Sequence, residues 1–219
     1  MTINKKNEGR RKKTEPILIF PFNGNAIEAV DCLNNEYHLI AFVDDERTKQ
    51  KTDFEGYSVL SRAAFTEYPE SFVLAVPGSP ESFLLRREII EGLNIGKERF
   101  ACVLHPKAEI SKQSSIGHNF LAMAGVVITS NAIIGNHVCI LPNTVVHHDA
   151  TIGDWTLIGS NVSVAGGVWI GKNCYIGSGS CIKNGVRIGA GSLIGLGSTV
   201  IRDVPDNATV VGNPAREIA

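Results

Sequence analysis

The chain of 219 residues lacks a long apolar run and lacks an excess of charge of either sign. Lys and Arg number 21 against 22 Asp and Glu, so the formal net charge is −1. A membrane span needs roughly 18 or more apolar residues in a row, and nucleic-acid binding usually requires a basic excess. We therefore expect a cytoplasmic globular protein with no membrane insertion and no nucleic-acid partner.

Cysteine pairs are also missing. The five cysteines are odd in number and include no Cys-x-x-Cys pair, which argues against a disulfide framework and against a zinc ribbon. Trp and Tyr are scarce, with two and four residues, whereas Gly is plentiful at 22 and is concentrated in the second half. The two halves of the chain therefore differ in architecture.

Residues 1–15 carry six positive charges and little apolar surface, so we predict a flexible basic tail. Residues 16–100 alternate apolar strand patterns, such as ILIF, HLIAFV and SFVLAV, with helical patterns. This alternation is typical of an α/β domain with a small parallel sheet. One predicted helix begins at Pro80 with Ser79 as its N-cap.

Residues 101–219 contain a six-residue repeat. From Leu104 to Val200 every sixth residue is aliphatic, and many of these residues are followed by glycine. A short fixed period of this kind indicates a parallel β-helix. The strongest Ile-Gly pairs recur every 18 residues, which is three repeats per coil and predicts a triangular prism.

The repeats and the C-terminal segment RDVPDNATVVGNPAREI resemble the left-handed β-helix acyltransferases. The segments LHPKAEIS, TVVHHDATIGDW and VVGNPAR, preceded by an α/β domain with an Asp-Asp pair, are similar to the sugar acetyltransferases of the sialic acid O-acetyltransferase (NeuD) and PglD type. This resemblance covers residues 16–219. It implies a Rossmann-like sheet followed by a left-handed parallel β-helix, a homotrimer, acetyl-CoA as co-substrate and no metal.

The resemblance places the catalytic histidine at His148 and its acidic partner at Asp149. A carboxylate beside an imidazole favours one tautomer and leaves the other ring nitrogen free to accept a proton. Without the resemblance, His147, His148 and Asp149 read as an ordinary polar turn. The resemblance also implies coenzyme contacts, through the backbone at coil corners, at Leu157, Ser178 and Leu196.

The acceptor site is expected in the α/β domain. The turn after the first strand keeps one glycine of the Gly-x-x-Gly-His-Ala pattern common in the family, and its backbone can still cradle a diphosphate. The carboxylates after the second strand stand where α/β sheets bind ribose hydroxyls or base N–H groups. The predicted substrate-binding residues are Asn23, Gly24, Asn25, Asp44, Asp45, Gly78 and Ser79.

The sequence thus predicts an acetyl-CoA-dependent N-acetyltransferase that acts on the amine of a nucleotide-linked amino sugar of surface glycans, with His148 as general base. The same machinery allows O-acetylation of a sialic acid or another sugar hydroxyl. A zinc lyase of the γ-carbonic anhydrase kind and a non-catalytic scaffold are alternatives from other classes. Among the other histidines, His105 is expected to be structural, and His118 and His137 to be solvated.

Overall fold

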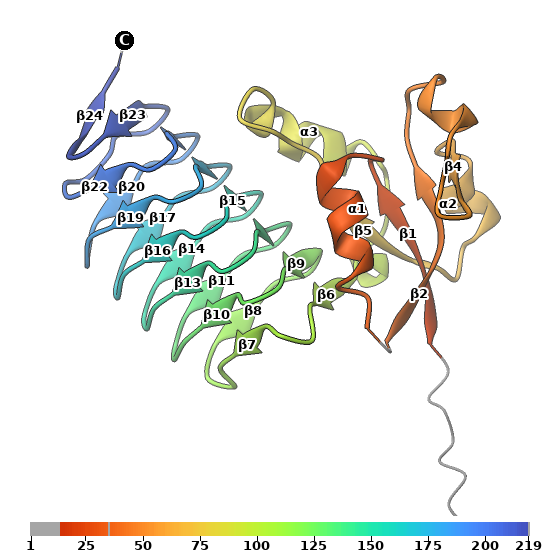
Figure 1. Cartoon of the computed structure of the whole chain (residues 1–219), viewed down its shortest axis with the longest axis horizontal. Coiled ribbons are helices and arrows are strands. Elements are labelled where there is room, and N and C mark those ends of the chain that lie inside the picture. The colour runs from red at the N-terminus through yellow and green to blue at the C-terminus, as the bar shows by residue number, and fades with distance from the viewer. Residues whose placement is uncertain (1–13, 35, 219) are drawn as a thin grey trace, which may run out of the picture.

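The computed structural model describes residues 14–34 and 36–218. A small sheet domain leads into a three-sided prism of short parallel strands (Figure 1). Residues 1–13 of the predicted tail lie outside the described residues, and Glu15 already belongs to the first strand.

The N-terminal sheet has five strands in the order β3-β4-β2-β1-β5. Strands β4, β2, β1 and β5 run parallel, and β3 is antiparallel to β4. The predicted parallel sheet is therefore present, with a short hairpin added at one edge. The strands are β1 (Glu15–Phe20), β2 (Tyr37–Val43), β3 (Asp53–Phe54), β4 (Tyr57–Leu60) and β5 (Phe72–Ala75).

Helices cover both faces of this sheet. Helix α1 packs, through Ala26 and Ala29, on the face of the sheet that points toward the prism. Helix α2 and Ile90 of α3 pack on the opposite face of the sheet. No helix within the described ranges is long and apolar enough to cross a membrane. The helices are α1 (Gly24–Val30), α2 (Ala64–Glu67) and α3 (Arg86–Glu91), with short 3₁₀ helices η1 (Lys49–Lys51), η2 (Phe83–Leu85) and η3 (Lys97–Arg99).

The predicted helix start at Pro80 is wrong. Residues 79–82 form a turn, η2 follows, and α3 begins only at Arg86. The Ser79 hydroxyl donates to the Glu81 carboxylate (2.6 Å), and the Ser79 backbone N–H donates to the Ser82 hydroxyl (3.1 Å). Because these side chains bond to one another, Ser79 caps no backbone N–H of a following helical turn.

The prism has three faces. Face 1 contains β6 (Cys102–Leu104), β9 (Phe120–Ala122), β12 (Cys139–Ile140), β15 (Leu157–Ile158), β18 (Tyr175–Ile176), β21 (Leu193–Ile194), β23 (Thr209–Gly212) and β24 (Ala215–Glu217). Face 2 contains β7 (Glu109–Ile110), β10 (Val127–Ile128), β13 (Val145–Val146), β16 (Ser163–Val164), β19 (Cys181–Ile182) and β22 (Thr199–Val200). Face 3 contains β8 (Ser115–Ile116), β11 (Ile133–Ile134), β14 (Thr151–Ile152), β17 (Trp169–Ile170) and β20 (Arg187–Ile188).

From β6 to β22, neighbouring strands of a face pair in parallel with partners 18 residues apart, such as Ile140 with Ile158, which confirms three repeats per coil. At the end of face 1, β23 pairs in parallel with β21, and β24 runs antiparallel to β23. Most of the repeated aliphatic residues point inward and form one buried core. Small hydroxyl residues also face inward: Thr144 is fully buried and donates to the Gly159 carbonyl (2.7 Å). The second half is thus the predicted left-handed parallel β-helix.

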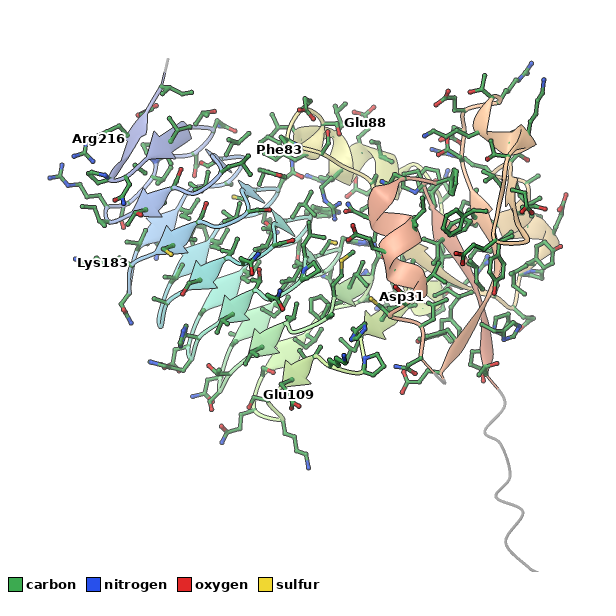
Figure 2. All side chains as sticks on the ribbon, in the orientation of Figure 1. Asp31, Phe83, Glu88, Glu109, Lys183 and Arg216 are labelled. Carbon is green, nitrogen blue, oxygen red and sulfur yellow. The ribbon has the colours of Figure 1, made fainter. Side chains whose placement is uncertain are left out.

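The N-terminal domain covers face 1. The outward side chains of Leu121, Cys139 and Tyr175 on this face share one buried cluster with Ala26 and Ala29 of α1. No element among the described residues covers faces 2 and 3 in this way, and their common edge lies opposite face 1. Lys183 marks that edge, on the side of the prism away from the N-terminal domain (Figure 2).

Candidate functional site

His148 and Asp149 occupy the coil corner between β13 and β14, on the edge shared by faces 2 and 3. Their side chains touch: His148 Nδ1 lies 2.7 Å from Asp149 Oδ2. Asn131, one coil earlier, donates from Nδ2 to Asp149 Oδ1 (3.1 Å). Both members of the pair remain more than half exposed, at 60% and 56% of their side-chain surface, so a ligand can reach them.

Hydrogen bonds hold the carboxylate in its charged form. The bond from His148, followed by the bond from Asn131, lowers the pKa of Asp149. An ionised carboxylate only accepts hydrogen bonds, so it pairs with a proton on Nδ1 and leaves the lone pair of the neutral ring on Nε2. The corner can therefore present a free imidazole nitrogen to solvent or to a substrate.

Gly166, one coil after His148, provides the surface on which the imidazole lies. A Cβ at this position would lie 2.6 Å from His148 Nε2 and 2.7 Å from Cε1. Within the described part of the chain the Gly166 N–H finds no hydrogen-bond acceptor, whereas the Gly167 N–H donates to the His148 carbonyl (2.9 Å). Sequence reasoning missed this residue, although a Gly-Gly pair 18 residues after His148 and Asp149 was the available signal.

A second site lies at the carboxyl ends of β1, β2 and β5. A cavity of about 520 Å³ opens there. Lys49 and Arg62, which sequence reasoning did not select, line this cavity. All seven predicted substrate-binding residues line it as well: Asn23, Gly24, Asn25, Asp44, Asp45, Gly78 and Ser79. We call this cavity the acceptor pocket.

The carboxylate of Asp44 in the pocket already accepts hydrogen bonds from groups of the protein. Asp44 is only 4% exposed. Its Oδ2 accepts from the Phe22 backbone N–H (3.0 Å) and from Lys49 Nζ (3.1 Å), and its Oδ1 accepts from the Glu46 backbone N–H (2.9 Å). Asp44 therefore fixes the turn after β1 and positions the Lys49 ammonium, in addition to lining the pocket.

The second carboxylate holds a cation in place. Asp45 pairs with Arg62 through two hydrogen bonds, Nε to Oδ1 (2.6 Å) and Nη2 to Oδ2 (2.8 Å). Arg62 also donates to the Gly92 carbonyl (2.9 Å) and lies over the Phe20 ring. A forked guanidinium and an ammonium in a pocket with amide and hydroxyl groups suit a phosphorylated ligand. Arg62 follows the end of β4 by two residues, so a signal for it was available, whereas Lys49 lies in η1 and follows no strand end directly.

The three predicted coenzyme-binding residues do not lie at one place: two lie at corners and one lies inside a strand. Ser178 and Leu196 lie at corners between faces 1 and 2, joined through the bond from the Gly197 N–H to the Ser178 carbonyl (2.9 Å), and Leu196 is 72% exposed. Leu157 is buried in face 1, and its N–H donates to the Cys174 carbonyl (2.9 Å). Leu157 thus offers neither an exposed side chain nor a free N–H.

His137 is buried rather than solvated, so the expectation for it is wrong. It lies between Phe100 and Trp155, and burial, with help from the charges of His118 and Arg86, lowers its pKa to about 4. Its Nδ1 lies 3.0 Å from Asn119 Nδ2. In the described ranges no group of three His, Cys, Asp or Glu side chains could hold a metal ion.

Comparison with known proteins agrees with the fold and with the six-residue repeat. The family model for the bacterial transferase hexapeptide (six repeats) matches residues 131–166, 149–184 and 167–202. No curated protein sequence matches the chain. Among solved structures, PerB from Caulobacter crescentus, in complex with CoA and GDP-perosamine, is 27% identical, with a TM-score of 0.81 over 94% of this chain and 97% of that one. The chain is therefore similar to sugar acetyltransferases and carries the hexapeptide repeats of bacterial transferases.

Two further structures share the fold of this acetyltransferase. WeeI from Acinetobacter baumannii is 25% identical, with a TM-score of 0.79 over 94% of this chain and all of that one (100%). The acetyltransferase domain of PglB from Neisseria gonorrhoeae, in complex with acetyl coenzyme A, is 22% identical, with a TM-score of 0.83 over 94% and 100%. The predicted resemblance, fold and enzyme class are confirmed.

Proposed function

We propose that this acetyltransferase transfers the acetyl group of acetyl-CoA to the amine of a nucleotide-linked amino sugar. The observation that carries the proposal is the exposed His148–Asp149 pair, with Nδ1 bound by the carboxylate and Nε2 available as a base. The acceptor pocket, with Lys49 and Arg62 on its wall, supports a nucleotide diphosphate as the handle of the sugar. Because both substrates are cytoplasmic metabolites, the proposal includes a cytoplasmic location for the enzyme.

His148 acts as general base in direct transfer. The amine nitrogen attacks the thioester carbonyl, and Nε2 takes the proton that the nitrogen loses as the new C–N bond forms. Asp149 stabilises the resulting imidazolium through Nδ1–H. The free N–H of Gly166, which lies beside the imidazole, donates to the oxyanion of the tetrahedral intermediate. The C–S bond then breaks, and the imidazolium returns the proton to the leaving thiolate of CoA.

The active site forms between copies of the chain. The acceptor pocket belongs to the domain that covers face 1, whereas His148 lies on the opposite edge of the prism. The pocket of one copy therefore serves His148 of a neighbouring copy in a homotrimer. Apolar side chains on the uncovered faces, including Val127, Val145 and the half-exposed Ile133, supply contact surface between prisms. Acetyl-CoA then lies between the His148 edge of one prism and the corner with Ser178 and Leu196 of the next.

The amine is favoured over a hydroxyl as acceptor. One general base can serve either nucleophile, so the geometry of the site alone does not distinguish an amine from a hydroxyl acceptor. The supporting observation is that a relative of the whole chain, at 26% identity, is a perosamine N-acetyltransferase solved with CoA and GDP-perosamine. Perosamine carries an amino group on its sugar ring.

A paired-substrate assay tests the proposal. The full chain is incubated with acetyl-CoA and with GDP-, UDP- or dTDP-linked amino sugars, and release of the CoA thiol is followed. Each amino sugar is matched by the analogue that carries a hydroxyl in place of the amine. We expect thiol release with an amino sugar, little with its hydroxyl partner, and loss of release in His148→Ala. Release with the hydroxyl analogues alone would instead establish O-acetylation.

A further inference from the structure

Arg86, the first residue of α3, bridges the two domains. It is fully buried, at 0% exposure. Its guanidinium donates to the carbonyl of Pro77 in the N-terminal domain and to two carbonyls at corners of the prism, those of His137 (2.7 Å) and Trp155 (2.9 Å). Within the described residues it forms no ion pair with a carboxylate. Burial lowers the pKa of Arg86 to about 10, so the group is still charged at neutral pH.

The arginine lies directly beneath the wall of the acceptor pocket. Gly78, which lines the pocket, has φ +116°, and a Cβ on it would lie 2.9 Å from Arg86 Cγ and 3.0 Å from Cδ. A side chain at position 78 is therefore excluded both by the backbone conformation and by the arginine stem. The loop from Pro77 to Ser79 rests on Arg86 and is bonded to it.

A second bridge holds the same segment two residues earlier. Asn119, at a corner of the prism, accepts from the Ala75 N–H (2.8 Å) and donates to the Ala75 carbonyl (2.9 Å). The end of β5 is thus fixed to the prism at Ala75 and at Pro77. Because the pocket wall begins at Pro77, these bonds set where that wall stands relative to the prism.

We infer that Arg86 is a positioning residue that sets the Pro77–Ser79 wall of the acceptor pocket on the prism, and with it the place of the nucleotide-linked sugar. This inference rests on the proposed function. Only a planar fork with five N–H groups can reach three carbonyls in different directions, and a lysine ammonium on a flexible stem cannot hold the same geometry. The requirement for a fork explains why a buried cation without a counter-ion stands here.

The test compares Arg86→Lys and Arg86→Met with Arg87→Met in the full chain. Arg87 is the exposed neighbour, paired with Glu91 on the helix surface, and serves as the matched control. Calorimetry measures the Kd of GDP, UDP and dTDP and the Kd of CoA for each variant, and saturation kinetics measure both KM values. Removal of the bridge lets the pocket wall move, so the Kd of the nucleotide should rise about tenfold, which is about 1.4 kcal/mol. The Kd of CoA should stay within about twofold.

Each outcome decides the matter. Weaker nucleotide binding in both Arg86 variants, with unchanged CoA binding and an unchanged Arg87→Met control, supports the inference. Equal weakening of both ligands, or nucleotide binding as in the wild type, overturns it while the proposed function stands. If the wild-type chain binds CoA but none of the three nucleotides, the acceptor pocket itself is wrong and both proposals fail. Should Arg86→Met not fold, Arg86→Lys carries the test with the same criteria.

Discussion

Replacement of Gly166 by alanine tests whether the imidazole needs the bare backbone beneath it. The added Cβ would lie 2.6 Å from His148 Nε2 and 2.7 Å from Cε1, whereas carbon and nitrogen atoms in contact prefer about 3.5–4.0 Å. The ring must therefore move by about 1 Å, which strains the 2.7 Å bond to Asp149. A misplacement of that size costs on the order of 10²-fold in rate.

We therefore expect Gly166→Ala to lower kcat by about 10²-fold while CoA binding changes little. The assay is thiol release at saturating substrates, with CoA binding measured separately by calorimetry. The matched control is Gly185→Asn, because Gly185 (φ +70°) lies at a later corner of the same edge, where an added Cβ would meet no other atom within 4 Å. Asn occupies many corners of this prism at similar φ, as at Asn131. A Gly166→Ala enzyme with wild-type kcat would refute the role given to this contact.

Four other predictions rest on the same geometry. His148→Ala should lower kcat by about 10²–10⁴-fold with CoA affinity kept; a variant with more than about a tenth of the wild-type rate would contradict the assignment of the base. Asp44→Ala should raise KM for the nucleotide sugar about tenfold or more, since it frees the turn at Phe22 and the Lys49 ammonium, and should leave KM for acetyl-CoA unchanged; equal shifts in both KM values would count against the acceptor pocket. With the nucleotide sugar kept well below its KM, co-expressed His148→Ala and Asp44→Ala chains should be more active than the two variants expressed separately, because a mixed trimer contains pairs of intact half-sites. Absence of any gain would indicate that each chain works alone. The pKa of His137 is about 4 in the folded chain against an ordinary 6.5, so between these pH values the residue takes up a proton only when the chain unfolds. The free energy of unfolding should therefore fall as pH drops from 6.5 to 4, by at most about 1.4 kcal/mol per pH unit. Urea unfolding across this window should show a weaker dependence of the free energy of unfolding on pH in His137→Gln than in wild type.

The prism could be predicted because its signal is local and repeated. Every sixth residue from Leu104 onward had to be aliphatic to fill a narrow core, and the 18-residue recurrence fixed three faces. The cover on face 1 carried a signal too, since its outward positions are apolar from β6 to β21, as at Leu121, Leu157 and Tyr175, whereas faces 2 and 3 mix polar and apolar residues. These outward positions can be recognised as one row only when each repeat has been assigned to its face.

The site could be predicted only in part. The seven acceptor-pocket residues follow strand ends, so the order of strands was enough to bring them together. The burial of His137 and the bridge from Arg86 depend on how the two domains dock. The bonds of Asp44 depend on how the turn after β1 and the segment around η1 approach the end of β2. No local pattern encodes either arrangement. The helix predicted from Pro80 begins only at Arg86, because Ser79 bonds to the Glu81 and Ser82 side chains instead of capping a helical turn.

The most direct test of the central claim is the mass and linkage of the product made from acetyl-CoA and a nucleotide-linked amino sugar by wild type and by His148→Ala. The proposal predicts a gain of one acetyl group in an amide bond, stable to hydroxylamine, formed by wild type and at least about 10²-fold more slowly by the variant. An ester that hydroxylamine removes, or an amide formed at equal rates by both chains, would contradict it.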